Sequence, residues 1–272
     1  MNLIKQLKYD LQNGLWRWQY LLAIPIFLFS CLLCTTECGT YCSLTDYFIF
    51  SFWGNLPISN VSINQELHIP TMWLLIINGG LCINLGYMIS DLSSTGSQRI
   101  IRCRKRGFWF FSKCVWNVTS CFLYFVLALL TVTLFSVLLF GYISFAPSIQ
   151  LIDRLSEGIT YQSSILLEDA LLIGIILPLI TLITYTILEM ALCLFVKPII
   201  SFMIGVIIQV VALCYQSPLI IGNGAMVIRN SILVSNGVSS SELLLSMTCT
   251  ILLSFGIGYH RFSRMDILGA GE

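Results

Sequence analysis

Six long apolar stretches constrain what this chain can fold into. A helix needs about 20 predominantly apolar residues to cross the ~30 Å hydrocarbon core of a bilayer, and each stretch is about that long or longer. The sequence therefore predicts an all-α, polytopic membrane protein with six transmembrane helices. The expected spans are residues 18–35, 71–90, 115–145, 170–190, 198–215 and 243–260.

Composition supports a membrane domain and leaves no room for a soluble one. Charged residues make up 10% of the 272 residues and hydrophobic ones 57%, against about 25% charged in a typical soluble domain. No stretch between the spans is long enough for a separate domain, so residues 1–272 are expected to form a single transmembrane domain. The formal net charge of +1 gives no reason to expect a nucleic-acid partner.

The distribution of Lys and Arg predicts the orientation. If the amino terminus lies inside, twelve of the fourteen Lys and Arg residues fall in inner segments, and only Arg154 and Arg229 fall outside. Inner loops of membrane proteins carry such an excess of Lys and Arg. We therefore expect a multi-pass protein of the cell membrane with both termini in the cytoplasm.

The segment before the first span has the pattern of an amphipathic helix. Leucines recur every four residues from Leu3 to Leu15, with Lys5, Lys8 and Asp10 on the remaining surface. This pattern predicts an elbow helix over about residues 1–17 that lies on the inner leaflet. The helix either moves with the first span or serves as a plain membrane anchor.

Two outer segments are apolar but too short or too irregular to span. Residues 44–57 are rich in aromatic side chains and are expected to lie at the lipid interface or to dip into it. Residues 217–236 mix apolar groups with Gly and Asn, as re-entrant or interfacial turns do. Both are expected to cap the outer end of the bundle. Cys38 and Cys42 lie on the same side, either as a disulfide or as two free thiols.

The inner segment between the second and third spans is strongly basic. Five residues between positions 99 and 106 are cationic, and Ile100 and Ile101 lie among them. One interpretation is attraction to anionic lipid, at about 1 kcal/mol for each cation. The other is a short helix that docks in a groove of a cytosolic partner. The candidate partner-binding residues are Ser97, Arg99, Ile100, Ile101, Arg102, Arg104, Lys105 and Arg106.

The chain carries no motif for catalysis or for nucleotide binding. It lacks the G-x-x-x-x-G-K-[ST] loop that cradles phosphates, so ATP and Mg²⁺ would have to bind a separate subunit, and this chain is expected to bind no cofactor itself. Its two histidines, His68 and His260, lie on opposite sides of the membrane and cannot share a metal. An enzyme is therefore not expected, and no metal site is predicted.

Four polar residues lie within the apolar stretches. Asn78, Asn84 and Gln209 either join helices through hydrogen bonds or line a pathway. Glu189 lies near the inner end of the fourth span. It is either a gate or proton-relay residue, or a structural group that reaches the inner surface or pairs with Lys197.

Taken together, the chain resembles ABC-2 type transporter permeases. The resemblance rests on six spans with both ends inside, the elbow, the basic segment GSQRIIRCRKRGFWFFSK, a tight turn between the fourth and fifth spans, and the C-terminal RFSRMDI. It implies an exporter in which two permeases, identical or related, pack together and an ATP-binding cassette subunit binds the coupling helix at residues 97–106. The pathway would follow the second and fifth spans, where Asn78, Asn84 and Gln209 lie. An antimicrobial peptide or another amphipathic molecule is the expected cargo.

An alternative function does not involve ATP. The chain is then a multi-pass transporter of another kind, or an immunity or sensory membrane protein. The feature that separates the two interpretations is the basic inner segment, because a docking helix requires a partner and a lipid-facing one does not.

Overall fold

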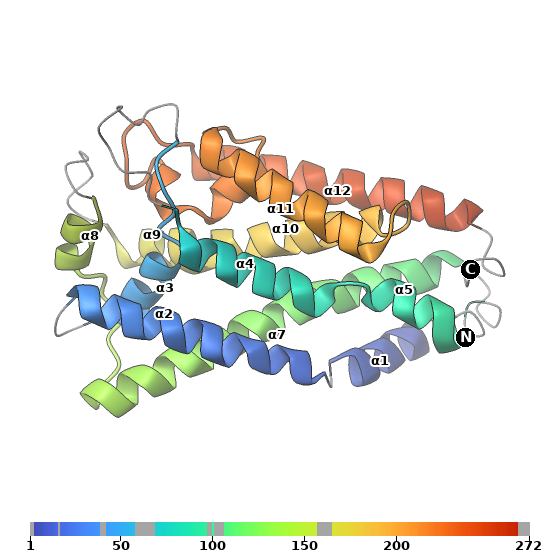
Figure 1. The fold of residues 1–272 in the computed structure, drawn as a ribbon, viewed down its shortest axis with the longest axis horizontal. Helices are drawn as coiled ribbons and strands as arrows, with labels where there is room; N and C mark the ends of the chain where they lie inside the picture. The colour runs from blue at the N-terminus through green and yellow to red at the C-terminus, as the bar shows by residue number, and fades with distance from the viewer. Residues whose placement is uncertain are drawn as a thin grey trace.

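The computed structural model describes residues 3–15, 17–38, 42–57, 69–96, 100, 106–156 and 165–265. Within these ranges the chain is helical and contains no β-strand, as predicted. The long helices run side by side along one axis and form an elongated bundle (Figure 1).

Five helical runs in the described ranges are long and apolar enough to cross a membrane. The membrane character of the chain is thus supported, whereas the count of six remains a prediction. The fifth expected span is the 17-residue helix α11 (Pro198–Cys214), about 26 Å long and shorter than the other five. The five runs consist of η1 (Trp18–Leu22) with α2 (Ala23–Cys38), α4 (Thr71–Asn84) with α5 (Tyr87–Asp91), α7 (Arg106–Phe140), α9 (Leu167–Leu171) with η4 (Leu172–Ile176) and α10 (Leu177–Leu192), and α12 (Ser240–Arg264).

The third span differs most from its expected bounds. Helix α7 begins at Arg106 and ends at Phe140, whereas residues 115–145 were expected. The residue that follows the helix, Gly141, has a positive φ of 74°, a conformation that glycine adopts readily. The early start was missed because the first turns of α7 contain polar and charged residues that lower the local hydropathy.

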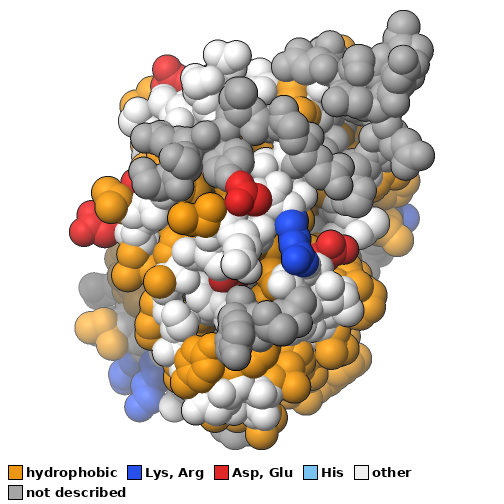
Figure 2. Space-filling model, turned by 90° about the vertical axis from the view of Figure 1, so that its left-hand side faces the viewer, with side chains coloured by type: hydrophobic (Ala, Val, Ile, Leu, Met, Phe, Trp, Pro, Cys, Tyr) orange, Lys and Arg blue, Asp and Glu red, His pale blue; other side chains and the backbone are white. Residues whose placement is uncertain are grey.

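The two ends of the bundle differ in what closes them. Helix α1 (Leu3–Gly14) begins, and α12 ends, at one end, which we call the inner end (Figure 1). Helices α3 (Leu44–Ser51) and α8 (Ile149–Ser156) lie at the opposite, outer end, as do the 3-10 turns η5 (Ile221–Ala225) and η6 (Val227–Arg229). Figure 2 looks onto the outer end, where several acidic side chains are visible and basic ones are few.

The outer caps are part of the core. The side chains of Phe48 and Phe52 are wholly buried, so the expectation that residues 44–57 lie at the lipid interface is wrong for them. The N–H groups of Val227 and Ile228 donate to the carbonyls of Phe52 (2.9 Å) and Trp53 (3.0 Å). These bonds join the two outer caps, which together close the outer end of the bundle.

Arg229 is the centre of this outer cap, although it was expected to be an outer-loop cation. Its buried guanidinium donates to the Asn55 carbonyl (2.7 Å), to the Asn223 side chain, and to carbonyls at the end of α11. Burial lowers its pKa to about 10, so it stays charged at neutral pH. A cation suits this position because the last carbonyls of a helix carry partial negative charge. The α11 acceptors are the carbonyls of Ala212, Leu213 and Tyr215.

Helix α1 confirms a helix in the expected elbow region but not the expected exposure of its faces. Its buried positions are Gln6, Asp10 and Gly14, and it packs against α7. The side chain of Ile4 is 79% exposed, as expected for an apolar residue that faces lipid, whereas Asp10, expected on the remaining surface, is wholly buried. The helix is therefore attached to the bundle by a polar face.

Candidate functional site

A buried ion network joins three helices at the inner end. The Lys113 ammonium, on α7, lies 2.8 Å from a carboxylate oxygen of Asp10 on α1 and 2.7 Å from one of Asp91 on α5. The second Asp10 oxygen accepts hydrogen bonds from Ser112 (2.5 Å) and Gln6 (3.0 Å). Lys113 and Asp10 are both wholly buried. From the sequence, Lys113 was counted among the loop cations of the inner face, and its burial between α1 and α5 was missed.

Aromatic rings surround this network. The Lys113 ammonium lies 4.5 Å from the centre of the Tyr87 ring and 5.1 Å from that of Trp109, distances at which a cation is attracted to the ring face. Tyr87 also stacks on Trp116, with ring centres 3.8 Å apart. The aromatic residues at positions 108–116 are the sequence signal that could have indicated the burial of Lys113. On a helix, a lysine in such a run is surrounded by aromatic rings rather than by water.

Most of the candidate partner-binding residues lie outside the described residues, namely Ser97, Arg99, Ile101, Arg102, Arg104 and Lys105. Arg106 is the first residue of α7. The side chain of Ile100 is only 3% exposed and packs with Met88, Leu92 and Trp109 at the inner end. Ile100 was expected to anchor a partner, but its side chain packs within its own bundle.

The polar residues of the spans fall into two groups. Asn78 on α4 and Gln209 on α11 form a reciprocal amide pair, with N···O distances of 2.9 and 3.2 Å. Asn84 lies apart from them and donates to the Gly80 carbonyl (3.2 Å) and to the sulfur of Cys121 (3.8 Å). Asn78 and Gln209 thus join the second and fifth expected spans, as the helix-joining interpretation predicts.

The second span is broken directly after Asn84. Helix α4 ends there, Gly86 has a positive φ of 67°, and α5 begins at Tyr87. The side chain of Arg17 donates to the Ile83 carbonyl (2.9 Å), which supplies a partner for one backbone group near the break. Irregular backbone at membrane depth needs protein around it. Here helix α10 and Arg17, the residue before η1, surround the break.

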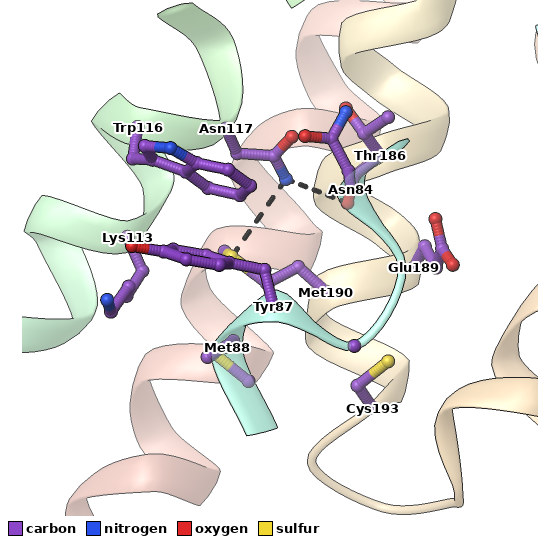
Figure 3. Close-up of a pocket in the computed structure, with 11 residues that line it drawn as sticks. Asn84, Tyr87, Met88, Lys113, Trp116, Asn117, Thr186, Glu189, Met190 and Cys193 are labelled. Carbon is purple, nitrogen blue, oxygen red and sulfur yellow. Dashed lines mark hydrogen bonds between the residues drawn. The ribbon is translucent and has the colours of Figure 1, made fainter. Parts of the chain in front are cut away.

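A narrow pocket lies beside this break. It leaves room for about 10 Å³, which is one water molecule at most. Figure 3 shows Asn84, Asn117 and Glu189 in its lining, with Glu189 across the pocket from Trp116 and Lys113. All three offer oxygen acceptors without a donor from the described residues: both carboxylate oxygens of Glu189 and the amide oxygens of Asn84 and Asn117.

Glu189 is the most unusual group in this pocket. Its side chain is 4% exposed, and in the part of the chain described it makes no ion pair with Lys197. It therefore neither pairs with Lys197 nor reaches the inner surface in this structure. A buried carboxylate without a partner costs several kcal/mol unless it takes up a proton.

Comparison with protein-family models, with curated proteins and with solved structures finds no match for this chain. Any function assigned to the chain therefore depends on the arrangement of its described residues.

Proposed function

We propose that this chain is the membrane subunit of an ATP-driven exporter of the ABC-2 type. It would lie in the cell membrane with both of its termini in the cytoplasm. A separate ATP-binding cassette subunit would bind the basic segment at residues 97–106 and hydrolyse ATP. The observation that carries this proposal is the buried ion network of Lys113, Asp10 and Asp91.

The network ties together both ends of the basic segment. Asp91 precedes the segment and Lys113 follows it, and their charged groups are in direct contact. Because Lys113 also binds Asp10, a displacement of the segment acts on α1, α5 and α7 as one unit. A loop that only binds lipid has no need of such a connection, whereas a loop moved by an ATPase does.

Charge is then the main means of partner recognition. Since the side chain of Ile100 is used inside the chain, the proposed contacts to the partner come from the five cations of the segment, Arg99, Arg102, Arg104, Lys105 and Arg106. We expect an acidic cleft on the ATPase. A second permease copy or a related permease would complete the pathway along α4 and α11, and the cargo is proposed to be an antimicrobial peptide or another amphipathic molecule.

The test reverses two of these charges. Arg102→Glu with Arg104→Glu is expected to abolish co-purification of an ATPase subunit and the ATP hydrolysis that comes with it, because two attractions become repulsions. The matched control is Lys5→Glu with Lys8→Glu, which reverses two exposed cations of α1 at the same end. Equal loss in both variants, or no loss in the first, would contradict the docking assignment.

A second candidate function is an ATP-independent transporter coupled to protons, and Glu189 favours it. An ionisable residue buried in a span is a typical proton carrier, and Glu189 lies beside a broken helix, as coupling sites of secondary transporters do. Glu189→Gln removes the exchangeable proton with little change of shape. The expected result is an infrared band of a protonated carboxyl group that is present in the parent chain and missing in E189Q. Identical carboxyl bands in the two chains would contradict this function.

A further inference from the structure

Three cysteine side chains meet at the outer end of α2. Cys34 and Cys38 lie one helical turn apart on α2, and Cys42 follows the end of the helix. The Cys34 sulfur is 3.9 Å from the sulfurs of both Cys38 and Cys42, and all three sulfurs lie within 4.8 Å of one another. All three are free thiols, so the structure contains no Cys38–Cys42 disulfide.

The chain holds Cys42 in place although it lies outside a helix. The next residue, Ser43, caps α3: its side chain accepts from the Asp46 N–H, and its own N–H donates to the Asp46 carboxylate (2.8 Å). The second Asp46 oxygen accepts from the N–H of Ser148 (2.9 Å). The third thiol is thus positioned by a hydrogen-bonded framework before any ligand arrives, which lowers the cost of ordering a site.

The three thiols differ in their exposure. Cys34 is wholly buried, Cys42 is 6% exposed, and Cys38 is partly exposed. The hydroxyl group of Tyr47, which is 1% exposed, has no hydrogen-bond partner in the described residues. Access from outside is therefore through Cys38.

We propose that Cys34, Cys38 and Cys42 bind one copper(I) ion. Thiolates select soft ions such as Cu(I) and Zn²⁺. A metal about 2.3 Å from each sulfur in a trigonal plane would place the sulfurs about 4 Å apart. The Cys34 sulfur lies 3.9 Å from each of the other two, and the Cys38 and Cys42 sulfurs lie within 4.8 Å of each other. Structural zinc requires four ligands, and no fourth Cys, His, Asp or Glu joins the group within the described residues. Three sulfurs are enough for Cu(I).

Binding is a ligand exchange without a change of oxidation state. Copper stays Cu(I) and leaves the ligands of the complex that delivers it, each thiol that becomes a ligand releases its proton to solvent, and three sulfur–copper bonds form. The resulting site is anionic. Arg154 provides a nearby positive charge, since its guanidinium donates to the carbonyl of Glu37, the residue before Cys38.

The test titrates Cu(I) into the purified, reduced full-length chain in detergent, in competition with bathocuproine disulfonate. We expect one bound equivalent with a near-ultraviolet thiolate-to-copper band. Cys34→Ser, Cys38→Ser and Cys42→Ser should each weaken binding at least tenfold. The matched controls are Cys31→Ser, buried one turn earlier on α2, and Cys249→Ser on α12, which should bind as the parent does. Thermal unfolding of each variant confirms that it is folded.

Three results would overturn the proposal. The first is a parent chain that yields all its copper to the chelator, and the second is an equal loss of binding in the C31S or C249S control. The third is displacement of the copper band by an excess of Zn²⁺, which would reveal a four-coordinate site. Mass spectrometry of protein that was alkylated during its isolation from membranes supplies a further check, because a disulfide among the three cysteines would contradict the site. None of these results depends on whether an ATPase binds the chain.

Discussion

Replacing Lys113 with methionine is expected to lower the free energy of unfolding by about 3–5 kcal/mol, the range found when one partner of a buried ion pair is removed. The substitution keeps most of the side-chain volume, so packing changes little. It leaves Asp10 and Asp91 without the ammonium that binds both of them. The measurement is equilibrium unfolding in mixed micelles with increasing SDS.

Asp10→Asn is the matched control for that experiment. It removes one negative charge but leaves the ion pair between Lys113 and Asp91 intact, and the amide still accepts a hydrogen bond from Ser112. We expect D10N to lower the free energy of unfolding clearly less than K113M does. We also expect the double variant to recover part of the stability that K113M loses. If K113M unfolds as the parent chain does, the network does not hold α1 and α5 to α7 and cannot couple the basic segment to them.

Replacing Arg229 with methionine is expected to cost about 3 kcal/mol or more, because each buried acceptor left without a donor costs about 1–3 kcal/mol. The guanidinium serves the last carbonyls of α11, the Asn223 side chain, and both the carbonyl and the side chain of Asn55. Its loss should loosen the outer cap before the rest of the bundle. Faster proteolysis within residues 217–236, together with a lower unfolding midpoint, is the expected observation.

Arg229→Lys separates charge from geometry at the same site. Lysine keeps the positive charge near the end of α11 but has three donors in place of the five of the planar guanidinium. We expect R229K to lower the free energy of unfolding by about half as much as R229M does. Full retention in R229K would mean that charge alone matters, and equal loss in both variants would mean that the hydrogen-bond geometry is decisive.

The sequence predicts the class of fold well and the surroundings of its polar groups poorly. The apolar stretches are long and nearly free of charge, so hydropathy alone locates the helices that are long and apolar enough to cross a membrane. It does not show which helix face packs inward. For α1, the leucine repeat predicted the wrong attachment because Asp10 has its partner, Lys113, more than a hundred residues away in the sequence.

The candidate site shows the same limit. Asn78 and Gln209 were recognised as polar residues at membrane depth, but their mutual hydrogen bonds depend on how α4 and α11 are placed. Likewise, Ile100 is apolar beside charged residues, a pattern that fits both an exposed anchor and an internal one. Cys34 was interpreted as a small hydrophobic residue of a span, and only the path of the chain after α2 brings Cys42 beside it.

Helix α7 has a consequence for how this protein responds to its lipid environment. Its 35 residues make a rod about 52 Å long, well beyond the ~30 Å of hydrocarbon, and it crosses the bundle diagonally (Figure 1). A helix longer than its membrane adjusts by tilting. The inner end of α7, where Lys113 binds Asp10 and Asp91, would therefore rise or sink with the thickness of the bilayer, so that acyl-chain length becomes a variable that sets the depth of this buried network.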